Sequence, residues 1–378
     1  MMKIILDITR LVRRISSKKT LTGIDRVSIA YVKHFRNKSH ALIRYAGKNF
    51  ILSNNESLKL FTWILNPDYS LNILVTIIKG AKPQKQFREA ILINTGHIGL
   101  KQKNYSRMIN KLNLKPFFVV HDLIPIIYPE YCSTGEEIRH ATKINYVINF
   151  AHGIITNSNA TLTDLKNYAK NNNRALPKSK TSLLASDMQF LPNNARPIKN
   201  PYFVVLSTID PRKNHILLLQ IWRKFVQDLG ESAPHLIIIG KRGWECEQVI
   251  DLLDRCKFLL NFVDEVSKCN DQDLVNYICH SQALLFPSFA EGYGLPLIEA
   301  LSLKIPVISS DLPVFKEIAG EIPEYIDPLD GKKWAEVILE YTNSDSKLRK
   351  NQLERIANFT GPSWKNHFQI VDSFINDD

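Results

Sequence analysis

The chain has 378 residues, of which 44% are hydrophobic and 23% charged, with 15 glycines and 18 prolines. This composition is typical of a folded globular protein and excludes collagenous, disordered and low-complexity chains. The length favours two domains of about 150 to 200 residues. The formal net charge of +12 points to partners that carry phosphate: anionic lipid, a phosphorylated ligand or nucleic acid.

The basic residues gather in two clusters, residues 10–19 and 166–180, without an aromatic-studded nucleic-acid motif beside them. This favours a membrane surface over nucleic acid, with plain solvated surface as the alternative. The five cysteines lack CxxC pairs or histidines at zinc-ligand spacing, so we expect free thiols in the cytoplasm. We expect neither a signal peptide nor a transmembrane helix.

Short apolar, β-branched runs alternate with longer mixed stretches along the first half of the chain. The runs are residues 3–7, 72–78, 90–94, 117–121 and 153–157. This alternation predicts βα units and a parallel sheet. Because polar residues follow several runs, including His121 and Asp122, we expect a ligand at the carboxyl edge of that sheet.

A second set of runs begins after a polar, proline-containing connector at residues 191–201, where we place the domain boundary. The runs are residues 202–207, 235–240, 258–263, 283–287 and 306–309. They carry little polar alternation, as expected of strands covered by helices on both faces. Residues 361–378 form a separate amphipathic pattern that predicts a final helix.

The stretch FPSFAEGYGLPLIEA, residues 286–300, predicts a buried strand, a glycine-containing loop and a helix beginning near Leu295. A helix start presents free N–H groups and a positive dipole to an anion. Glu291 and Glu299 flank this loop, and a carboxylate can accept hydrogen bonds from two adjacent sugar hydroxyls. The alternative is that Glu291 is a helix-start charge and Glu299 a surface residue.

FPSFAEGYGLPLIEAL followed by IPVISSDLPVFKEIAG resembles the E-x7-E region of retaining glycosyltransferase family 4. The resemblance implies an α/β GT-B fold with two Rossmann-like domains, a deep interdomain cleft and a C-terminal crossover helix. Residues 1–195 would bind the acceptor, residues 196–360 the nucleotide-sugar donor, and residues 361–378 would pack back on the first domain.

By the same resemblance Glu291 would contact the donor hexose and Glu299 the ribose. The loop between them would contribute backbone amides near the sugar and phosphate, from Gly292, Tyr293, Gly294 and Leu295. LSTIDPRKNH resembles the family's first strand and loop of the donor domain, so Lys213 would bind the pyrophosphate, aided by Arg212. Many family members carry arginine where this chain has Ser207. The alternative for Arg212 and Lys213 is two solvated surface cations.

FFVVHDLIPIIYPEY resembles the family's HD element, which would place His121 against the donor sugar; a satisfied structural His–Asp pair is the alternative. TLTGIDRV resembles the loop under the donor phosphates, with Gly23 allowing close approach, although a simple turn explains it as well. The region around Val263 resembles the strand that reads the nucleotide base.

These features imply a retaining glycosyltransferase with no cofactor and no metal, in which cations stabilise the leaving group. The resemblance is greatest to bacterial surface-polysaccharide mannosyl- and rhamnosyltransferases. We expect GDP-mannose as donor, a polyprenyl-diphosphate-linked O-antigen or capsule glycan as acceptor, and a place on the inner face of the cytoplasmic membrane. Transfer from dTDP- or UDP-sugars, a GT-B epimerase or phosphorylase, and a non-catalytic sugar-binding protein are the alternatives.

Overall fold

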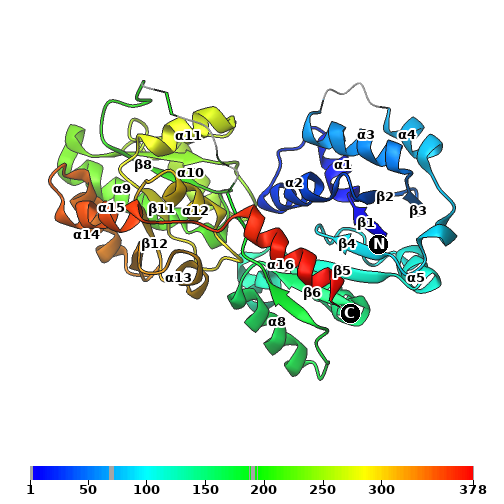
Figure 1. Cartoon of the computed structure of the whole chain (residues 1–378). Helices are drawn as coiled ribbons and strands as arrows, with labels where there is room; N and C mark the ends of the chain where they lie inside the picture. Colours follow the sequence, from blue (N-terminus) through cyan, green and yellow to red (C-terminus); the bar gives the residue numbers. More distant parts are fainter. Residues whose placement is uncertain (1–2, 68–71, 187, 189–191, 194, 378) are drawn as a thin grey trace. The chain divides into compact units, whose positions relative to one another are not determined.

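The computed structural model describes residues 3–67, 72–186, 188, 192–193 and 195–377. The chain divides into two compact units, shown in sequence colours in Figure 1. Unit 1 contains Met1–Leu123, Ile138–Leu184 and Trp364–Asp378, and unit 2 contains Ile124–Glu137 and Ala185–Ser363. The boundary expected at residues 191–201 therefore falls inside unit 2; Leu191 and Asn194 of that connector lie outside the described residues.

Unit 1 is built on a seven-stranded sheet in the order β3-β2-β1-β4-β5-β6-β7, parallel except for the antiparallel β2–β3 pair. Its strands are β1 Ile4–Asp7, β2 Ser39–Tyr45, β3 Lys48–Ile51, β4 Ile91–Asn94, β5 Lys115–Val120, β6 Gly153–Thr156 and β7 Ser179–Thr181. The order reverses direction between β1 and β4, which is where doubly wound sheets bind ligands.

Helices cover both faces of this sheet, as the apolar runs predicted. Phe117 of β5 meets Phe374 of α16 with ring centroids 5.5 Å apart, whereas the next residue, Phe118, meets Tyr146 of α7 at 6.2 Å. Successive strand residues point to opposite faces, so each face of β5 has its own helical layer. Both phenylalanines are fully buried.

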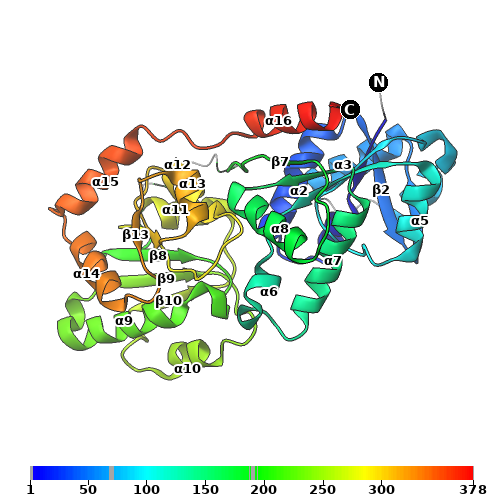
Figure 2. The same cartoon turned by 90° about the horizontal axis from the view of Figure 1, so that it is seen from below.

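The helices of unit 1 follow the strands in chain order. They are α1 Thr9–Ser16, α2 Gly23–Phe35, α3 Asn54–Leu65, α4 Ile73–Gly80, α5 Lys103–Leu112, α7 Glu136–Phe150, α8 Asn159–Asn171 and α16 Trp364–Asn376, with the 3-10 turn η1 Gln84–Phe87. Helix α16 forms in the predicted tail and packs on α2, where Phe368 contacts Tyr31 at 5.1 Å. Figure 2 labels α7, α8 and α16 on this unit.

The strand expected at residues 72–78 is wrong, because the structure forms helix α4 there. Asn72 is the N-cap of this helix, and its side-chain oxygen accepts a hydrogen bond from the Val75 amide at 3.1 Å. The run is rich in β-branched residues, which favour strands. The cap satisfies a backbone amide that a helix start otherwise leaves unpaired, so the local cap prevailed over the side-chain preference.

Unit 2 is built on a six-stranded parallel sheet in the order β10-β9-β8-β11-β12-β13, the Rossmann order 3-2-1-4-5-6 when its strands are counted along the chain. The strands are β8 Tyr202–Leu206, β9 His235–Ile239, β10 Val263–Val266, β11 Leu284–Phe286, β12 Val307–Ser310 and β13 Glu324–Ile326. The strand expected at residues 258–263 begins only at Val263. Phe258 is 44% exposed, so the stretch before Val263 is not buried as a strand of this sheet would be.

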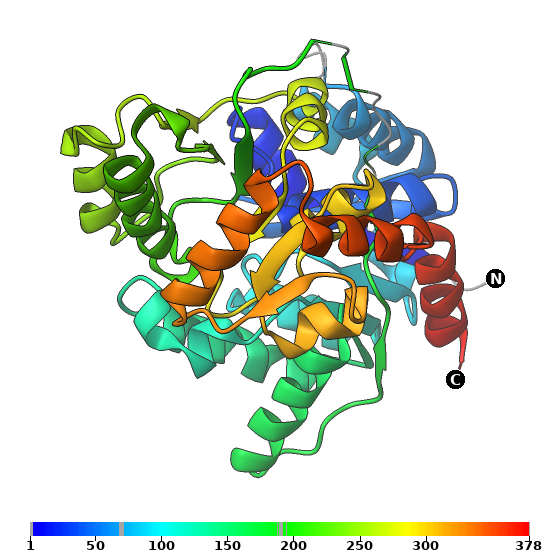
Figure 3. The same cartoon turned by 90° about the vertical axis from the view of Figure 1, so that its left-hand side faces the viewer.

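The helices of unit 2 form a layer on each side of this sheet (Figure 2). They are α6 Ile124–Ile127, α9 His215–Leu229, α10 Glu247–Arg255, α11 Asp271–Cys279, α12 Leu295–Ser302, α13 Pro313–Ala319, α14 Gly331–Thr342 and α15 Lys347–Ala357, with 3-10 turns η2 Pro129–Tyr131, η3 Pro211–Lys213 and η4 Gly230–Ser232. Trp222 of α9 and Trp334 of α14 are fully buried in one core cluster with β8 and β9. Figure 3 shows the orange part of the chain passing from β13 into α14 and α15.

No helix in the described part of the chain is long and apolar enough to cross a membrane.

Candidate active site

The strand order of unit 2 places the loops after β8 and β11 beside each other at the carboxyl edge of the sheet. Strands β8 and β11 are neighbours, and the order reverses direction at this point. The first loop carries Arg212 and Lys213 in η3, and the second carries Glu291 before α12. The topology therefore brings together two of the predicted motifs, 78 residues apart, at the position where such sheets bind ligands.

Glu291 bridges the two predicted cations of this loop pair. Lys213 Nζ donates to Glu291 Oε1, and Arg212 Nη1 lies 2.8 Å from Glu291 Oε2. Arg212 Nη1 also donates to the carbonyl of Ala290 at 2.6 Å, and the Arg212 carbonyl accepts from the Phe289 amide at 2.9 Å. The site therefore holds a carboxylate between two cations.

Burial and charge act in opposite directions on these three groups. Burial of Glu291 acts to raise the pKa of its carboxyl, but the charges of Arg212 and Lys213 together hold that pKa at about 2. Burial, followed by repulsion from Arg212, lowers the pKa of Lys213. The carboxylate is ionised at neutral pH, so it is an acceptor-only group able to bind hydroxyls.

The loop from Gly292 to Leu295 leads directly into helix α12. Gly294 is the N-cap with φ of +129°, and a Cβ atom there would lie 2.8 Å from Cε1 of Phe315, so only glycine fits. Tyr293 is buried, and Leu295 with Pro296 opens the helix. Pro296 has no N–H and the Leu297 amide donates to the Gly294 carbonyl at 3.1 Å, so the Leu295 amide is the donor that this helix start offers beside the Glu291 loop.

Glu299 lies inside α12 with only 1% of its surface exposed, which excludes the alternative of a surface residue. Its place in the second turn of the helix that follows Gly294 keeps it close to the Glu291 loop, so it stays a candidate ligand group. Asp210 contributes a further acid to this end of the sheet; burial raises its pKa, and its Oδ1 atom is buried without a hydrogen-bond partner.

The structure does not bring Val263 together with these residues. Val263 is the first residue of β10 and pairs with Leu236 near the start of β9. In a parallel sheet that end lies opposite the carboxyl edge where Arg212, Lys213 and Glu291 gather. Val263 therefore lies at the amino end of β10 and Val266 at its carboxyl end, and a contact of this region with the base stays a prediction.

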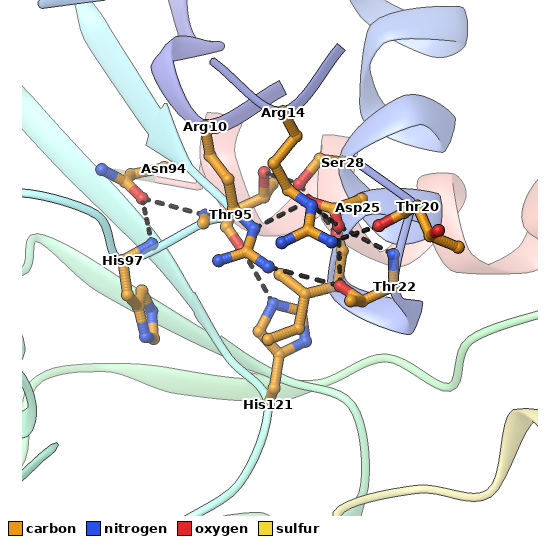
Figure 4. Close-up of polar contacts among 12 residues, drawn as sticks. Arg10, Arg14, Thr20, Thr22, Asp25, Ser28, Asn94, Thr95, His97 and His121 are labelled. Carbon is orange, nitrogen blue, oxygen red and sulfur yellow. Dashed lines mark hydrogen bonds and ion pairs between the residues drawn. The ribbon is translucent and has the colours of Figure 1, made fainter. Parts of the chain in front are cut away.

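In unit 1 the loops after β1 and β4 meet at the corresponding reversal of strand order. Figure 4 shows Arg10 and Arg14 of α1 converging on the carboxylate of Asp25 in α2. Arg10 Nε lies 2.7 Å and Arg14 Nε 2.8 Å from it, and the Asp25 side chain is fully buried. The Thr22 amide and hydroxyl donate to the same carboxylate at 2.8 and 2.7 Å. Sequence reasoning missed Asp25, although Thr22-x-x-Asp25 has capping-box spacing.

The contacts with Asp25 divide the basic residues of the stretch 10–19 into two groups. Arg10 and Arg14 are engaged with Asp25, whereas Arg13, Lys18 and Lys19 are exposed. Gly23 is the first residue of α2, directly after the N-cap Thr22, so it lies at a helix start as predicted. The structure shows Gly23 in that turn and assigns it no ligand.

His121 follows β5 and lies with 9% of its surface exposed near the same cluster. Its Nε2 atom is 2.8 Å from the carbonyl oxygen of Thr95. Because a carbonyl can only accept, Nε2 carries the proton and Nδ1 is the acceptor. Burial lowers the pKa of His121, so the ring is neutral at pH 7. The Thr95 carbonyl therefore orients the ring.

His97, which sequence reasoning also missed, lies beside His121 with ring centroids 6.1 Å apart. Its backbone has φ of +48°, a conformation that is strained for a residue with a Cβ. Its Nε2 atom is buried without a hydrogen-bond partner, and burial lowers its pKa well below the ordinary value. Strain and an unpaired buried polar atom in one residue are typical of a functional site.

Among the described residues, no group of three or more histidine, cysteine, aspartate or glutamate side chains is arranged to hold a metal ion.

Residues 189–358 match the family model described as "Glycosyl transferases group 1". The chain is 28% identical over 270 residues to the serotype-specific mannosyltransferase WbdA of Escherichia coli, covering 67% of this chain and 32% of that protein. It is 30% identical over 165 residues to O-antigen chain mannosyltransferase B of the same species, covering 44% and 43%. The chain thus spans about a third of the length of the first relative and less than half of the second.

Among solved structures, the chain is similar to Alr3699/HepE of Anabaena in complex with UDP and glucose, with a TM-score of 0.68. The likeness covers 99% of each chain at 16% identity, so it shows the fold alone. That fold is GT-B, as the motif resemblance implied.

Proposed function

We propose that the chain is a retaining, metal-independent glycosyltransferase, as the match of residues 189–358 to the family model "Glycosyl transferases group 1" supports. The observation that carries the proposal is the contact of Glu291 with Arg212 and Lys213 at the point where the strand order of unit 2 reverses. A nucleotide diphosphate sugar carries both an anion for the cations and hydroxyls for the carboxylate.

Lys213 and Arg212 stabilise the departing nucleotide diphosphate in this mechanism. A charge develops on the leaving phosphate as the glycosidic bond breaks, and fixed cations in a partly buried site stabilise it without a divalent ion. Arg212 supplies the second cation that Ser207 does not, since Ser207 instead pairs with His215 at 3.2 Å. Glu291 positions the hexose, Glu299 binds the ribose, and the amides after Gly292 contact sugar and phosphate.

His121 contributes a neutral imidazole from unit 1. With Nε2–H fixed on the Thr95 carbonyl, the acceptor face of the ring at Nδ1 is available for a hydroxyl of the substrate. We place this hydroxyl on the donor sugar. The attacking acceptor hydroxyl gives its proton to the leaving phosphate on the same face, which retains the anomeric configuration without a dedicated protein base.

The donor we propose is GDP-mannose, and the acceptor a growing polyprenyl-diphosphate-linked glycan of O-antigen or capsule. The names of the relatives, an O-antigen chain mannosyltransferase and a serotype-specific mannosyltransferase, support this sugar and this class of polysaccharide. The alternative is rhamnosyl or other hexosyl transfer from dTDP- or UDP-sugars. The transfer assay described below distinguishes these donors.

The lipid part of the acceptor would lie on unit 1. A hollow of about 530 Å³ is lined by apolar side chains of α1, α2 and the end of α3, among them Ile15, Ile29 and Ile64. Lys33 and Arg36 line the same hollow. With the exposed Arg13, Lys18 and Lys19, this surface suits an anionic membrane, so we propose a peripheral position at the inner face of the cytoplasmic membrane.

The transfer assay is direct. The full chain is incubated in EDTA with GDP-mannose, dTDP-rhamnose or UDP-glucose and a polyprenyl-diphosphate-linked oligosaccharide, and products are identified by mass spectrometry. An added sugar that keeps the anomeric configuration it had in the donor, read by NMR, is the expected result. Inversion of configuration, or transfer that requires a restored divalent metal, would contradict the mechanism.

A further inference from the structure

A cluster of aromatic side chains lies beside the Glu291 loop and takes no part in the mechanism above. It consists of Tyr128, Tyr131 and Phe289, called here the aromatic platform. The rings of Tyr131 and Phe289 are stacked, with centroids 5.2 Å apart and planes 5° from parallel. Tyr128 lies 6.0 Å from Tyr131, at 32°, and is 39% exposed. Tyr128 is therefore the exposed member of the platform, and Tyr131 and Phe289 are partly buried.

The segment that carries the two tyrosines has an unusual place in the chain. Ile124–Glu137 follows His121 directly in sequence but belongs to unit 2, whereas the residues before and after it belong to unit 1. Its short helix α6, labelled in Figure 2, leads into the 3-10 turn η2. One stretch of 11 residues, from His121 to Tyr131, thus joins the proposed sugar-binding histidine to a ring stacked near Glu291.

The platform is held rigidly and is continuous with the donor-sugar site. The Tyr128 amide donates to the Ile124 carbonyl at 2.8 Å, and the Tyr131 amide donates to the Tyr128 carbonyl at 3.1 Å. The Phe289 amide donates to the carbonyl of Arg212 at 2.9 Å. Phe289 is two residues before Glu291 in the same loop, so the ring that stacks on Tyr131 and the carboxylate are carried by one loop.

We propose that the aromatic platform binds a pyranose ring of the acceptor glycan; this rests on the proposed function. A hexose presents an apolar C–H face that fits an aromatic ring, and hydroxyls at its edge that fit the phenol groups of tyrosine. Rigid tyrosines provide such contact at low cost in side-chain entropy. The charged groups beside the platform favour a hydroxylated ring over a purely apolar ligand, because they would lose hydration against a hydrocarbon chain.

The test separates acceptor binding from donor binding. Saturation-transfer NMR with methyl α-D-mannopyranoside and methyl α-D-glucopyranoside, in the presence of UDP or GDP, reports whether a hexose ring lies on aromatic protons. The double variant Tyr128→Ala, Tyr131→Ala should lower the affinity for the hexoside at least fivefold. The matched double variant Tyr128→Phe, Tyr131→Phe keeps the ring faces and should keep most of this affinity. Tyr45→Ala, which removes a 51% exposed tyrosine of unit 1, is the surface control.

Nucleotide-induced thermal shifts of the same variants distinguish the two proposals. We expect all variants to bind nucleotide and nucleotide sugar as the wild type does. Hexoside binding should be lost only in the double alanine variant. Hexoside binding that survives in the alanine pair would overturn the platform, as would no hexoside signal in the wild type. Loss of nucleotide-sugar binding together with the hexoside would overturn it too, since the rings would then serve the donor. A wild type without any nucleotide shift contradicts the proposed function instead.

Discussion

Lys213 and Glu291 form a direct ion pair across the two loops that end β8 and β11, although 78 residues separate them in the chain. The pair keeps an acid and a base in opposite charge states at one ligand site. The carboxylate that would hold a sugar also shields the cation that would hold phosphate. Substrate binding must therefore redistribute these contacts, because a diphosphate competes with Glu291 for Lys213 and Arg212.

Replacing Glu291 with glutamine separates these roles. We expect diphosphate affinity to be kept or raised, because the competing charge is gone, while sugar transfer falls at least tenfold. The lost charge-assisted contacts should lower the free energy of unfolding at pH 6 by about 2 to 3 kcal/mol. Isothermal titration with GDP and denaturant melts measure both quantities.

The stability difference should also depend on pH in a defined direction. The folded-state pKa of Glu291 is depressed to about 2 from an ordinary 4.5. Its contribution to stability is therefore complete above pH 4.5 and is lost as the pH falls from 4.5 toward 2. The gap between wild type and Glu291→Gln should shrink between pH 6 and pH 3; a gap that stays constant would contradict the ion pair.

His121 should remain neutral across the physiological range, with its proton on Nε2. Burial lowers its pKa, and the Thr95 carbonyl accepts from Nε2. Nitrogen-15 NMR of the ring should show a protonated Nε2 and an unprotonated Nδ1 at pH 7, with no titration at pH 6.5. His121→Ala should lower the transfer rate about 100-fold. A normal titration midpoint would remove the reason for assigning Nδ1 as the acceptor.

Asp25 should be a major determinant of the stability of unit 1. Its fully buried carboxylate accepts from Arg10 and Thr22 and forms an ion pair with Arg14, so Asp25→Asn leaves two partly buried cations without their counter-charge. Breaking such a network costs about 3 kcal/mol or more. The matched control is Asp345→Asn: the Asp345 side chain is 86% exposed and pairs with Lys350 at the surface, so its loss should cost below about 1 kcal/mol. Equal losses in both variants would show that the Asp25 network contributes nothing.

Membrane binding should depend on Arg13, Lys18 and Lys19, and not on Arg14. Each cation near an anionic surface contributes about 1 kcal/mol, so changing all three to serine should weaken binding to phosphatidylglycerol vesicles at least tenfold. Arg14 is spared because its guanidinium serves Asp25.

The control for the vesicle experiment is a triple serine variant of exposed lysines in unit 2, namely Lys257, Lys332 and Lys333. It removes the same charge from the protein and should leave vesicle binding within about twofold. Equal weakening by both triple variants would mean that net charge alone, and not the surface around α1, attracts the membrane.

Several strands and the donor-site motifs could be predicted because their signals are local. Apolar runs marked β1, β5, β8 and β9, and the sequence from Phe286 to Ala300 contained the strand, loop and helix of the site in order. Strand β2 was missed because His40 and Arg44 interrupt its apolar run. Arg44 is nonetheless buried in the sheet, where its guanidinium lies 3.1 Å from the carboxylate of Asp7.

The rest depended on contacts between distant segments, which no local pattern contains. The Asp25 cluster joins α1 to α2, and the orientation of His121 comes from Thr95, 26 residues earlier. The packing of Ile124–Glu137 in unit 2 has no sequence signal that we recognise. For Val263 the motif resemblance marks only the segment, whereas the strand register, which local sequence does not contain, places it at the amino end of β10.

The most direct test of the central claim is the thermal shift that nucleotide sugars produce in EDTA, compared between wild type, Lys213→Met and Lys224→Met. Lys224 is the matched control, since it forms only an exposed pair with Asp228 on α9. A ligand that binds the folded state alone raises the melting temperature. We expect an EDTA-resistant shift with one nucleotide sugar, kept in Lys224→Met and lost in Lys213→Met. The same shift in both variants, or no shift with any nucleotide sugar, would contradict it.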